Sequence, residues 1–438
     1  MLHTAGLREL PLHMAAYAGD EKKVDTLIKY GYDINMQSSK RFTPLHMALC
    51  DEQDVPMEKR GIIDMLIKAG SRINMQNEKG QTPLHIAVYE ENDVGIIQML
   101  IDAGSDINAC NGNFETPLHM AVESGNVEIV CTLIDAASNI NMQNENINME
   151  NKEGETPLYI ASKLGHAEIV NRLIEATSGV DIYDNYMRTP LYIASKYGYD
   201  DVVCALIKAR CNTDINNREG DTPLSIASSQ GHASVVIQLI RANCDVNKPN
   251  NETPLYVASN KGHAEVVRVL IAAKCNVDMP NVNQQTPLFI ASAKGYVQPS
   301  SSQVAKGHVQ IVRDLINAQC HLDTQNMFQG DTPLHIASYY GYDDVVCELI
   351  KAGCKIDIKN KQGETPLQIA TFHGHVRVIR EFELIRARFF AFAMGTHHRL
   401  GDNNPSQRDV SSKFDIMKMI YNEMYGMSPN DNKIEEDA

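Results

Sequence analysis

Few side chains of this sequence are spaced so that they could carry out chemistry. Histidines come close together only at His373-x-His375 and His397-His398, where two imidazole rings could bind a metal ion. The sequence contains no phosphate-binding G-x-x-x-x-G-K-[ST] loop, no H-E-x-x-H motif, no G-x-S-x-G motif and no set of kinase motifs. His375 belongs to a Gly-His pair that recurs along the chain, so we interpret it as part of a turn. We predict a protein without enzyme activity, metal or cofactor.

The composition is typical of a folded protein with an acidic surface. Hydrophobic residues make up 43 % of the 438 residues and charged residues 22 %, which excludes wholesale disorder. The net charge of −15 argues against a protein that binds nucleic acid. The N-terminus lacks the pattern of a signal peptide, and no apolar run reaches the ~20 residues of a membrane helix. We expect a protein of the cytoplasm, with the nucleus as an alternative, and no membrane span.

The elements that position the side chains repeat along the chain. The tripeptide Thr-Pro-Leu occurs ten times, and a degenerate copy, Leu10-Pro11-Leu12, precedes it. Successive prolines are separated by 33, 39, 34, 40, 33, 33, 31, 33, 46 and 33 residues, so half of the gaps are 33. A period of this length identifies stacked repeats rather than independent domains. The prolines of the ten full copies are Pro44, Pro83, Pro117, Pro157, Pro190, Pro223, Pro254, Pro287, Pro333 and Pro366.

Each repeat predicts two short helices. In the repeat that begins at Thr156, this threonine is a helix N-cap, and Pro157 takes the first helical position, where its missing N–H costs nothing. Gly165 ends the helix because glycine readily adopts the left-handed conformation. The segment 167–176 then predicts a second helix with an apolar stripe, and a polar, Asn-rich loop leads to the next Thr-Pro-Leu.

This pattern resembles the ankyrin repeat, in which T-P-L-H-x-A is followed by Gly-His and a hydrophobic second helix at a period of 33 residues. Good copies begin at Thr82, Thr116 and Thr332, and the resemblance covers about residues 8–385. It implies an all-α fold, namely an α-solenoid of stacked helix-turn-helix repeats with β-hairpin finger loops. Five copies replace the family's histidine, which we expect to soften their turns: Tyr159, Tyr192, Ser225, Tyr256 and Phe289.

The repeats define the domain organisation. We predict a solenoid over 8–390, a linker over 391–408, an amphipathic helix over 409–426 and an acidic, disordered tail over 427–438. The repeats are predicted to begin near residues 8, 40, 79, 113, 153, 186, 219, 250, 283, 329 and 362.

Cysteines recur at one point of five consecutive repeats, where a redox or metal ladder would be one interpretation. Equivalent points of stacked helical layers lie about 10 Å apart, whereas a disulfide requires Cα atoms within about 7 Å of each other. We therefore predict buried, free thiols in place of alanine. These cysteines are Cys211, Cys244, Cys275, Cys320 and Cys354.

The resemblance also implies a binding surface. In the family, the two residues before the glycine that ends each inner helix point into a concave groove. Here these positions combine aromatic side chains with lysines, and Tyr and Phe supply large contact areas at low entropic cost. The alternative is a solvated face on which the tyrosines pack against neighbouring repeats. The predicted contacts for partner proteins with acidic, extended segments are Tyr17, Tyr89, Lys163, Lys196, Tyr197, Lys261, Lys294, Tyr339, Tyr340 and Phe372.

Three asparagines, Asn35, Asn108 and Asn247, share one spacing after a leucine of the outer helix. They are similar to the sites that a 2-oxoglutarate-dependent oxygenase hydroxylates in many ankyrin proteins. The alternative is a structural role, in which each side-chain amide satisfies backbone groups of the finger loop.

Together these features predict a monomeric scaffold or adaptor that binds partner proteins through the groove. One alternative is a substrate-recognition subunit of a ubiquitin ligase or a similar complex, docked through residues 409–425, although no F-box or SOCS-box pattern is recognisable there. Another is a fragment of a larger ankyrin-bearing channel, kinase or toxin. Deletion of 408–438 separates the first two, because only a ligase subunit would then lose its ligase core.

Overall fold

The computed structural model describes residues 10–50, 56–139, 147–177, 179–248, 252–294 and 302–398. Within these ranges every regular element is a helix and no strand is present. The chain divides into two compact units, Met1–Gly374 and His375–Ala438. The first unit holds the stacked repeats, and it contains the candidate binding surface.

Each repeat of the first unit begins with a short inner helix. Its first residue is the proline of the repeated tripeptide, as the preference of proline for this position predicts. The inner helices are α1 (Pro11–Tyr17), α3 (Pro44–Leu49), α5 (Pro83–Tyr89), α7 (Pro117–Ser124), α9 (Pro157–Leu164), α11 (Pro190–Tyr197), α13 (Pro223–Gln230), α15 (Pro254–Lys261), α17 (Pro287–Ala293), α19 (Pro333–Tyr340) and α21 (Pro366–Phe372).

A longer outer helix follows each of the inner helices α1 to α19. Its apolar stripe is buried, as in α10, where the side chains of Ile169, Val170 and Leu173 are at most 1 % exposed. The outer helices are α2 (Glu21–Lys29), α4 (Pro56–Lys68), α6 (Val94–Asp102), α8 (Val127–Asn139), α10 (Ala167–Ala176), α12 (Asp200–Lys208), α14 (Ala233–Arg241), α16 (Ala264–Ala272), α18 (Ser302–Asn317) and α20 (Asp343–Lys351).

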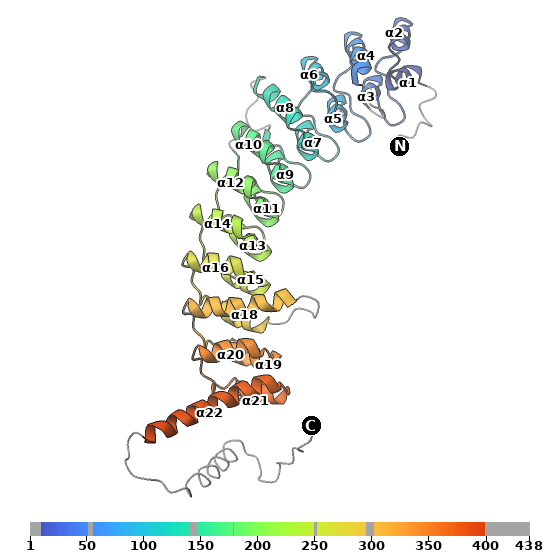
Figure 1. Cartoon of the computed structure of the whole chain (residues 1–438). Helices are drawn as coiled ribbons and strands as arrows, with labels where there is room; N and C mark the ends of the chain where they lie inside the picture. The colour runs from blue at the N-terminus through green and yellow to red at the C-terminus, as the bar shows by residue number, and fades with distance from the viewer. Residues whose placement is uncertain are drawn as a thin grey trace. The chain divides into compact units, whose positions relative to one another are not determined.

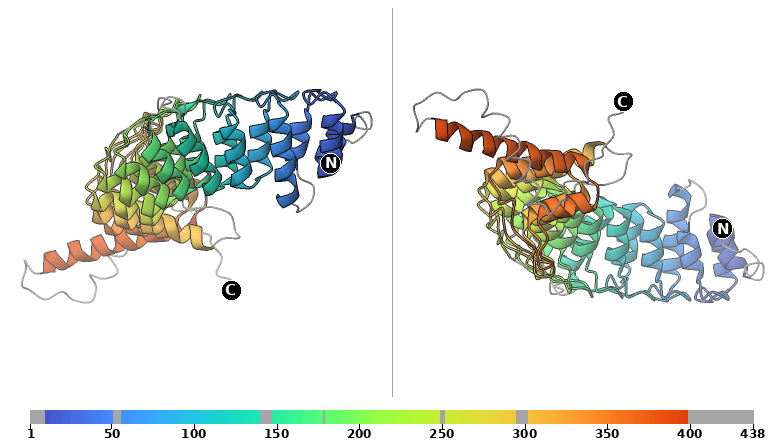
Figure 2. Two further views of the ribbon diagram at one scale, coloured as in Figure 1. Left: turned by 90° about the horizontal axis from the view of Figure 1, so that it is seen from above. Right: turned by 90° about the horizontal axis from the view of Figure 1, so that it is seen from below.

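The helix pairs of the first unit stack one after another. Each inner helix contacts the inner helix of the next repeat, as α11 contacts α13, and the outer helices contact one another in the same way, as α12 contacts α14. Figure 1 shows the odd-numbered helices in one row and the even-numbered helices in another. In the views of Figure 2, loops that connect the repeats run along one edge of the stack. The core is therefore a continuous layer between two rows of helices, and neighbouring repeats stabilise one another.

The ends of the helices agree with the sequence pattern. Thr156 caps α9 by accepting a hydrogen bond from the backbone N–H of Tyr159 at 3.2 Å. The first inner helix lacks this cap, because Leu10 stands in place of threonine. Gly165 ends α9 in the left-handed conformation, with a φ of 79°. At the corresponding point after α5, Glu91 adopts this conformation, with a φ of 50°.

Buried histidines tie several repeats to the next one. His46 accepts a hydrogen bond from the N–H of Thr43 through Nδ1 at 3.1 Å, and its Nε2 lies 3.2 Å from the backbone oxygen of Gln81 in the following repeat. Neutral imidazole satisfies both contacts, because one nitrogen accepts and the other donates. The equivalent link to the next repeat is formed by His13, His85, His119 and His335.

The expectation that each replaced histidine softens its turn stays a prediction, but the structure shows another link at some of these positions. At three positions a tyrosine hydroxyl keeps the connection, because it reaches a side chain of the following finger instead of a backbone oxygen. Phe289 has no hydroxyl and cannot form this hydrogen bond. The tyrosine links, at 3.0–3.1 Å, join Tyr159 to Asp184, Tyr192 to Asn217 and Tyr256 to Gln285.

Most of the described finger loops are closed by the side chain of an asparagine or aspartate, and the first is closed by Ser38. The Oδ1 atom of Asn77 accepts hydrogen bonds from the N–H groups of Lys79 and Gln81 at 2.9 and 3.0 Å, and the N–H of Asn77 donates to the oxygen of Gln81 at 2.9 Å. These bonds form the hairpin turn of the finger, but in the described ranges it does not extend into strands. The same side-chain turn occurs at Asn111, Asn151, Asp184, Asn217, Asn281 and Asn360.

The second unit contains α22 (Val376–His398). This helix passes the predicted boundary at 390, so residues 391–398, which we assigned to the linker, are helical. The physical reason is that the segment before Gly395 is rich in Ala, Phe, Arg and Met and has neither proline nor glycine to end the helix. The remainder of the predicted linker, the helix over 409–426 and the tail over 427–438 lie outside the described residues.

Candidate protein-binding surface

The carboxyl ends of the inner helices carry the predicted contact residues. Large side chains there are 46 % exposed at Tyr197 and 85 % exposed at Phe372. The exposed members of the set are Tyr89, Tyr197, Lys261, Lys294, Tyr339, Tyr340 and Phe372. The half-buried members are Tyr17, Lys163 and Lys196. We call these helix ends, together with the finger loops, the inner surface.

The lysines of the inner surface differ in their neighbours. Lys163 Nζ lies 2.8 Å from the carboxylate of Glu155, whose side chain is buried, so this charge already has a partner. Lys196 Nζ lies 5.8 Å from the centroid of the Tyr197 ring. Lys261 and Lys294 are exposed and form no ion pair with the residues that the structure describes. The positive charge that a partner could use is therefore greatest near the ends of α15 and α17.

The inner-helix ends carry acidic side chains nearer the N-terminus, although the first two fingers carry the exposed Lys40, Arg41 and Lys79. Glu123 in α7 corresponds in the repeat to Lys163, and Glu90 after α5 corresponds to Lys261. Partial burial, together with the carboxylates of Glu115 and Glu155, raises the pKa of Glu123. At the helix ends the sign of the charge therefore changes between α7 and α9, which was not part of the prediction from the sequence.

Five aromatic rings gather at the ends of α19 and α21. We call them the aromatic cluster, and the closest pair is Tyr339 with His373, whose ring centroids are 4.5 Å apart. Tyr339 also packs edge-on against Tyr340, at 5.0 Å between centroids. Edge-to-face and stacked rings at such distances stabilise one another. The structure thus brings together three of the predicted contacts, while Tyr17 and Tyr89 lie in separate, distant repeats. The members of the cluster are Tyr339, Tyr340, Tyr342, Phe372 and His373.

The finger loops contribute exposed aromatic side chains that the sequence analysis missed. Phe114, Tyr186 and Phe328 are 59 %, 59 % and 65 % exposed. Phe114 has a φ of 61° and stands where other fingers have a glycine, such as Gly80. A large residue in the left-handed conformation is strained, and such positions cluster at functional sites. Alignment of the repeats with one another would have revealed this signal.

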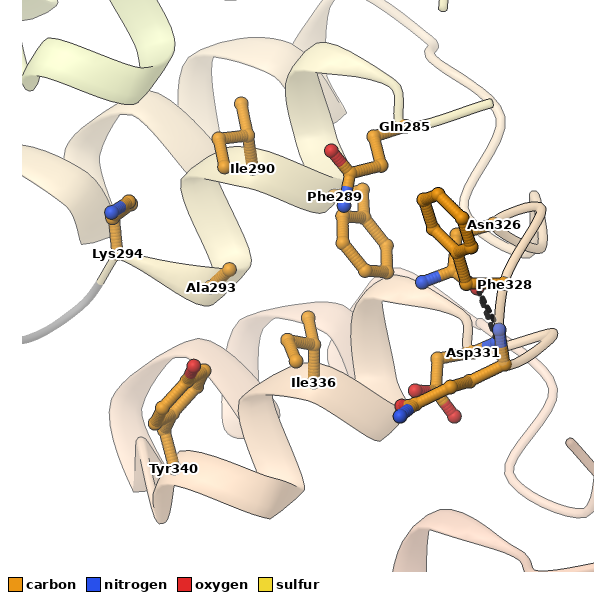
Figure 3. A pocket seen from close by; sticks show the side chains of 11 residues that line it. Gln285, Phe289, Ile290, Ala293, Lys294, Asn326, Phe328, Asp331, Ile336 and Tyr340 are labelled. Atoms are coloured by element: carbon orange, nitrogen blue, oxygen red, sulfur yellow. Dashed lines mark hydrogen bonds between the residues drawn. The ribbon is translucent and has the colours of Figure 1, made fainter. Parts of the chain in front are cut away.

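A pocket of about 380 Å³ opens on the inner surface between α17 and α19. Figure 3 shows Ile290 and Ala293 of α17 facing Ile336 of α19, with Phe328 of the finger at one end. At the other end lie Lys294 and Tyr340, both of them predicted contacts. An apolar hollow with a few polar groups at its rim is the usual form of a binding site.

An ionic network stiffens the middle of the inner surface. Arg188 Nε donates to the carboxylate of Asp184 at 2.7 Å, and Tyr159 donates to the same group. Burial alone would raise the pKa of Asp184, but the hydrogen bonds from Arg188 outweigh it and hold that pKa below its usual value. Burial beside this carboxylate raises the pKa of the Tyr159 hydroxyl. These groups therefore keep fixed charges near neutral pH and serve to position the finger.

The asparagines predicted as modification sites make structural contacts. Asn35 Oδ1 accepts the backbone N–H of Arg72 at 2.7 Å, and Asn247 Oδ1 accepts that of Asn276 at 2.7 Å. Each contact joins one repeat to the next and agrees with the structural alternative. The N–H of Asn108 donates to Asp106 Oδ1 at 3.0 Å. Hydroxylation at these positions stays a prediction.

The five recurring cysteines are buried free thiols, as the layer spacing predicted. Burial raises the pKa of Cys211, Cys244, Cys320 and Cys354 to about 12 and that of Cys275 to about 11. Because the thiolate is the reactive form, these side chains are poor nucleophiles and metal ligands.

Two features are absent from the described ranges. No group of three or more His, Cys, Asp or Glu side chains is placed there to hold a metal ion. Among the same residues, no helix is both long enough and apolar enough to cross a membrane. The inner surface therefore remains the candidate site.

Comparisons with known proteins agree with this architecture. A family model described as ankyrin repeats in three copies matches residues 57–144, 142–219, 205–281, 224–298 and 302–382, and one described as ankyrin repeats in many copies matches 12–50. No curated protein matches the sequence.

Two solved structures are similar to parts of the chain. The human ASB11 ankyrin repeat domain is 24 % identical, with a TM-score of 0.43 and coverage of 49 % of this chain and 92 % of that one. The ankyrin repeat domain of Bcl-3, a member of the IkappaB protein family, is 22 % identical, with a TM-score of 0.47 and coverage of 54 % and 98 %. The family models span well over half of the sequence, and the helix pairs, caps and fingers recur at their spacing. The chain therefore belongs to the ankyrin repeat family, whose repeats form a generic protein–protein interaction fold.

Proposed function

We propose that the protein is a monomeric, non-enzymatic scaffold or adaptor of the cytoplasm or nucleus. It binds partner proteins through the inner surface, and the partner supplies an acidic, extended segment. The observation that carries this proposal is the exposed aromatic cluster, which lies in the repeats next to the lysines that have no ion-pair partner among the described residues.

The chemistry of the inner surface supports this assignment. Aromatic side chains with two side-chain torsions lose little entropy when a partner covers them, and they dominate the energetics of many interfaces. Tyr339, Tyr340 and Phe372 are at least 46 % exposed although each is large and mainly apolar. Lys261 and Lys294 add charges that attract carboxylates and increase the rate of association. An acidic partner segment satisfies both features.

Replacement of Tyr197, Tyr339 and Tyr340 by alanine should remove the main contact area and leave the fold intact. We expect each true partner to bind the triple variant about tenfold more weakly than the wild type, since aromatic hot spots each contribute more than ~1 kcal/mol. The measurement is quantitative affinity purification with both baits, followed by titration of each purified partner by isothermal calorimetry.

A matched control comes from the chain itself. Tyr30, Tyr32 and Tyr183 are also at least 46 % exposed, but they lie between the end of an outer helix and the turn of the next finger, a part of the chain that we do not include in the inner surface. Their replacement by alanine removes the same number of tyrosines and should leave partner affinity within twofold. Equal binding by both triple variants, with unchanged unfolding midpoints, would show that the inner surface is not the interface.

A further inference from the structure

The pocket between α17 and α19 arises from two local changes in the repeat. Phe289 stands where Tyr256 of the preceding repeat sends its hydroxyl to the next finger, so α17 has no such hydrogen bond to the finger after it. That finger also has an extra residue, because Asn326 lies six residues before Thr332 and not five. A longer finger without this connection leaves the space between the two inner helices unfilled.

The lining of the pocket is apolar in the middle and carries one charged side chain at each end. Ile290, Ala293 and Ile336 face the hollow, and the rings of Phe328 and Tyr340 flank it (Figure 3). Its volume of about 380 Å³ lies near the lower end of the range for ligand sites, which suits one or two side chains better than a large cofactor.

The polar groups at the finger end of the pocket already have partners. Asp331 is buried and its Oδ1 accepts from Asn360 Nδ2 at 3.1 Å, while Asn326 Oδ1 accepts from the N–H groups of Gln329 and Asp331. Lys294, at the opposite end, is exposed and has no ion-pair partner among the described residues. A carboxylate that enters the pocket is therefore repelled by Asp331 and attracted by Lys294, which orients the ligand.

We propose that this pocket binds a large apolar side chain from an extended segment of the partner, an inference that rests on the proposed function. The residue next to this anchor in the partner is Asp or Glu, and its carboxylate pairs with Lys294. Burial of the anchor between Ile290 and Ile336 supplies affinity, and the ion pair fixes the direction of the segment across α17 and α19. The partner motif is thus an apolar residue with an acidic neighbour.

The test uses a phage-displayed library of random linear dodecapeptides, selected on the biotinylated full-length chain. We expect the selected peptides to share Leu, Met or Phe beside Asp or Glu. Synthetic, fluorescein-labelled versions are then titrated by fluorescence anisotropy. Ala293→Tyr, which fills the pocket, and Lys294→Glu, which reverses its charge, should each weaken binding about tenfold.

Two control variants separate the pocket from the rest of the surface. Ala242→Tyr adds the same ring at the end of the outer helix α14, and Lys208→Glu makes the same charge change at the end of the outer helix α12. Both should leave peptide affinity within twofold. Thermal unfolding of all four variants checks that none has lost its fold.

The outcomes distinguish the pocket from the proposed function. The pocket proposal is wrong if peptide affinity is unchanged by Ala293→Tyr and Lys294→Glu but falls when Tyr197, Tyr339 and Tyr340 are replaced. The proposal that partners bind the inner surface would still hold in that case. If none of the inner-surface variants changes peptide affinity, both the pocket and the proposed function of the inner surface are wrong. A selection that yields no binder, or only basic sequences, would also reject the pocket. The pocket is also rejected if Ala293→Tyr changes self-association in analytical ultracentrifugation but leaves peptide affinity unchanged.

Discussion

Acidification from pH 7 to pH 5 is expected to unfold the N-terminal repeats before the middle ones. His13, His46, His85 and His119 are buried in the first four repeats, and burial lowers the pKa of each, to about 4 at His46. An added proton on Nδ1 of His46 would face the N–H of Thr43, which now donates to that nitrogen. The five following repeats have Tyr, Ser or Phe at this position, and their one fully buried histidine among the described residues is His308 in α18.

The sign of the effect follows from proton linkage. Above pH 6.5 the histidines are neutral in both the folded and the unfolded chain, so their contribution to stability is fully present. As the pH falls below 6.5 the unfolded chain binds protons that the folded chain excludes, and stability is lost until the pH reaches the folded pKa. For His46 alone the free energy of unfolding should fall by about 2 kcal/mol between pH 7 and pH 5.

Hydrogen exchange with mass spectrometry measures this loss repeat by repeat, once intrinsic exchange rates are corrected for pH. Protection should fall more steeply from α1 to α8 than from α9 to α16, a range that ends before the buried His308 of α18. The matched variant is His46→Gln, since Gln368 occupies this position in the last inner helix and accepts the N–H of Thr365 at 2.9 Å without titrating. Its repeats should lose less protection on acidification. The histidine explanation is wrong if the N-terminal and middle repeats lose equal protection on acidification, or if His46→Gln does not reduce the loss.

The sequence predicted best what depends on neighbouring residues. The N-cap at Thr156, the proline at the first helical position and the left-handed glycine at Gly165 are set within a few residues of one another, so the repeated pattern was sufficient. The candidate inner surface was predicted at the level of helix ends, because the repeat fixes which residues share a face. Its division into acidic, basic and aromatic parts required only that the repeats be compared in order.

Contacts between repeats were harder to predict. The hydrogen bond from Tyr159 to Asp184 joins residues 25 positions apart, and nothing local shows that the hydroxyl reaches the finger. The pocket depends on two changes at once, the hydroxyl missing at Phe289 and the extra residue in the finger that follows α18. The end of α22 was misplaced because a helix continues through good helix formers even where the repeat pattern has ended.

Replacement of Gly198 by alanine is expected to weaken the stack by about 3 kcal/mol. Gly198 has a φ of +77°, which costs an alanine ~1–2 kcal/mol, and a Cβ there would lie 2.6 Å from Nδ1 of His232 in the next repeat. The imidazole must move, and the contact of its Nε2 with the oxygen of Lys196, now 3.1 Å, is lost at a cost of ~1 kcal/mol. Because each repeat is stabilised mainly by its neighbours, this loss falls on the contact between α11 and α13.

Gly353 provides the matched control for this prediction. Its φ is +89°, but nothing lies within 4 Å of the Cβ that alanine would add, so Gly353→Ala should lower stability only by the backbone strain of ~1–2 kcal/mol. Urea unfolding followed by far-ultraviolet circular dichroism gives both free energies. In addition, His232→Ala should cost less in the Gly198→Ala background than in the wild type, since the clash has already displaced the ring. The prediction is wrong if the two glycine variants lose equal free energy of unfolding and the effects of Gly198→Ala and His232→Ala are additive. Backbone strain alone would then explain the loss at Gly198.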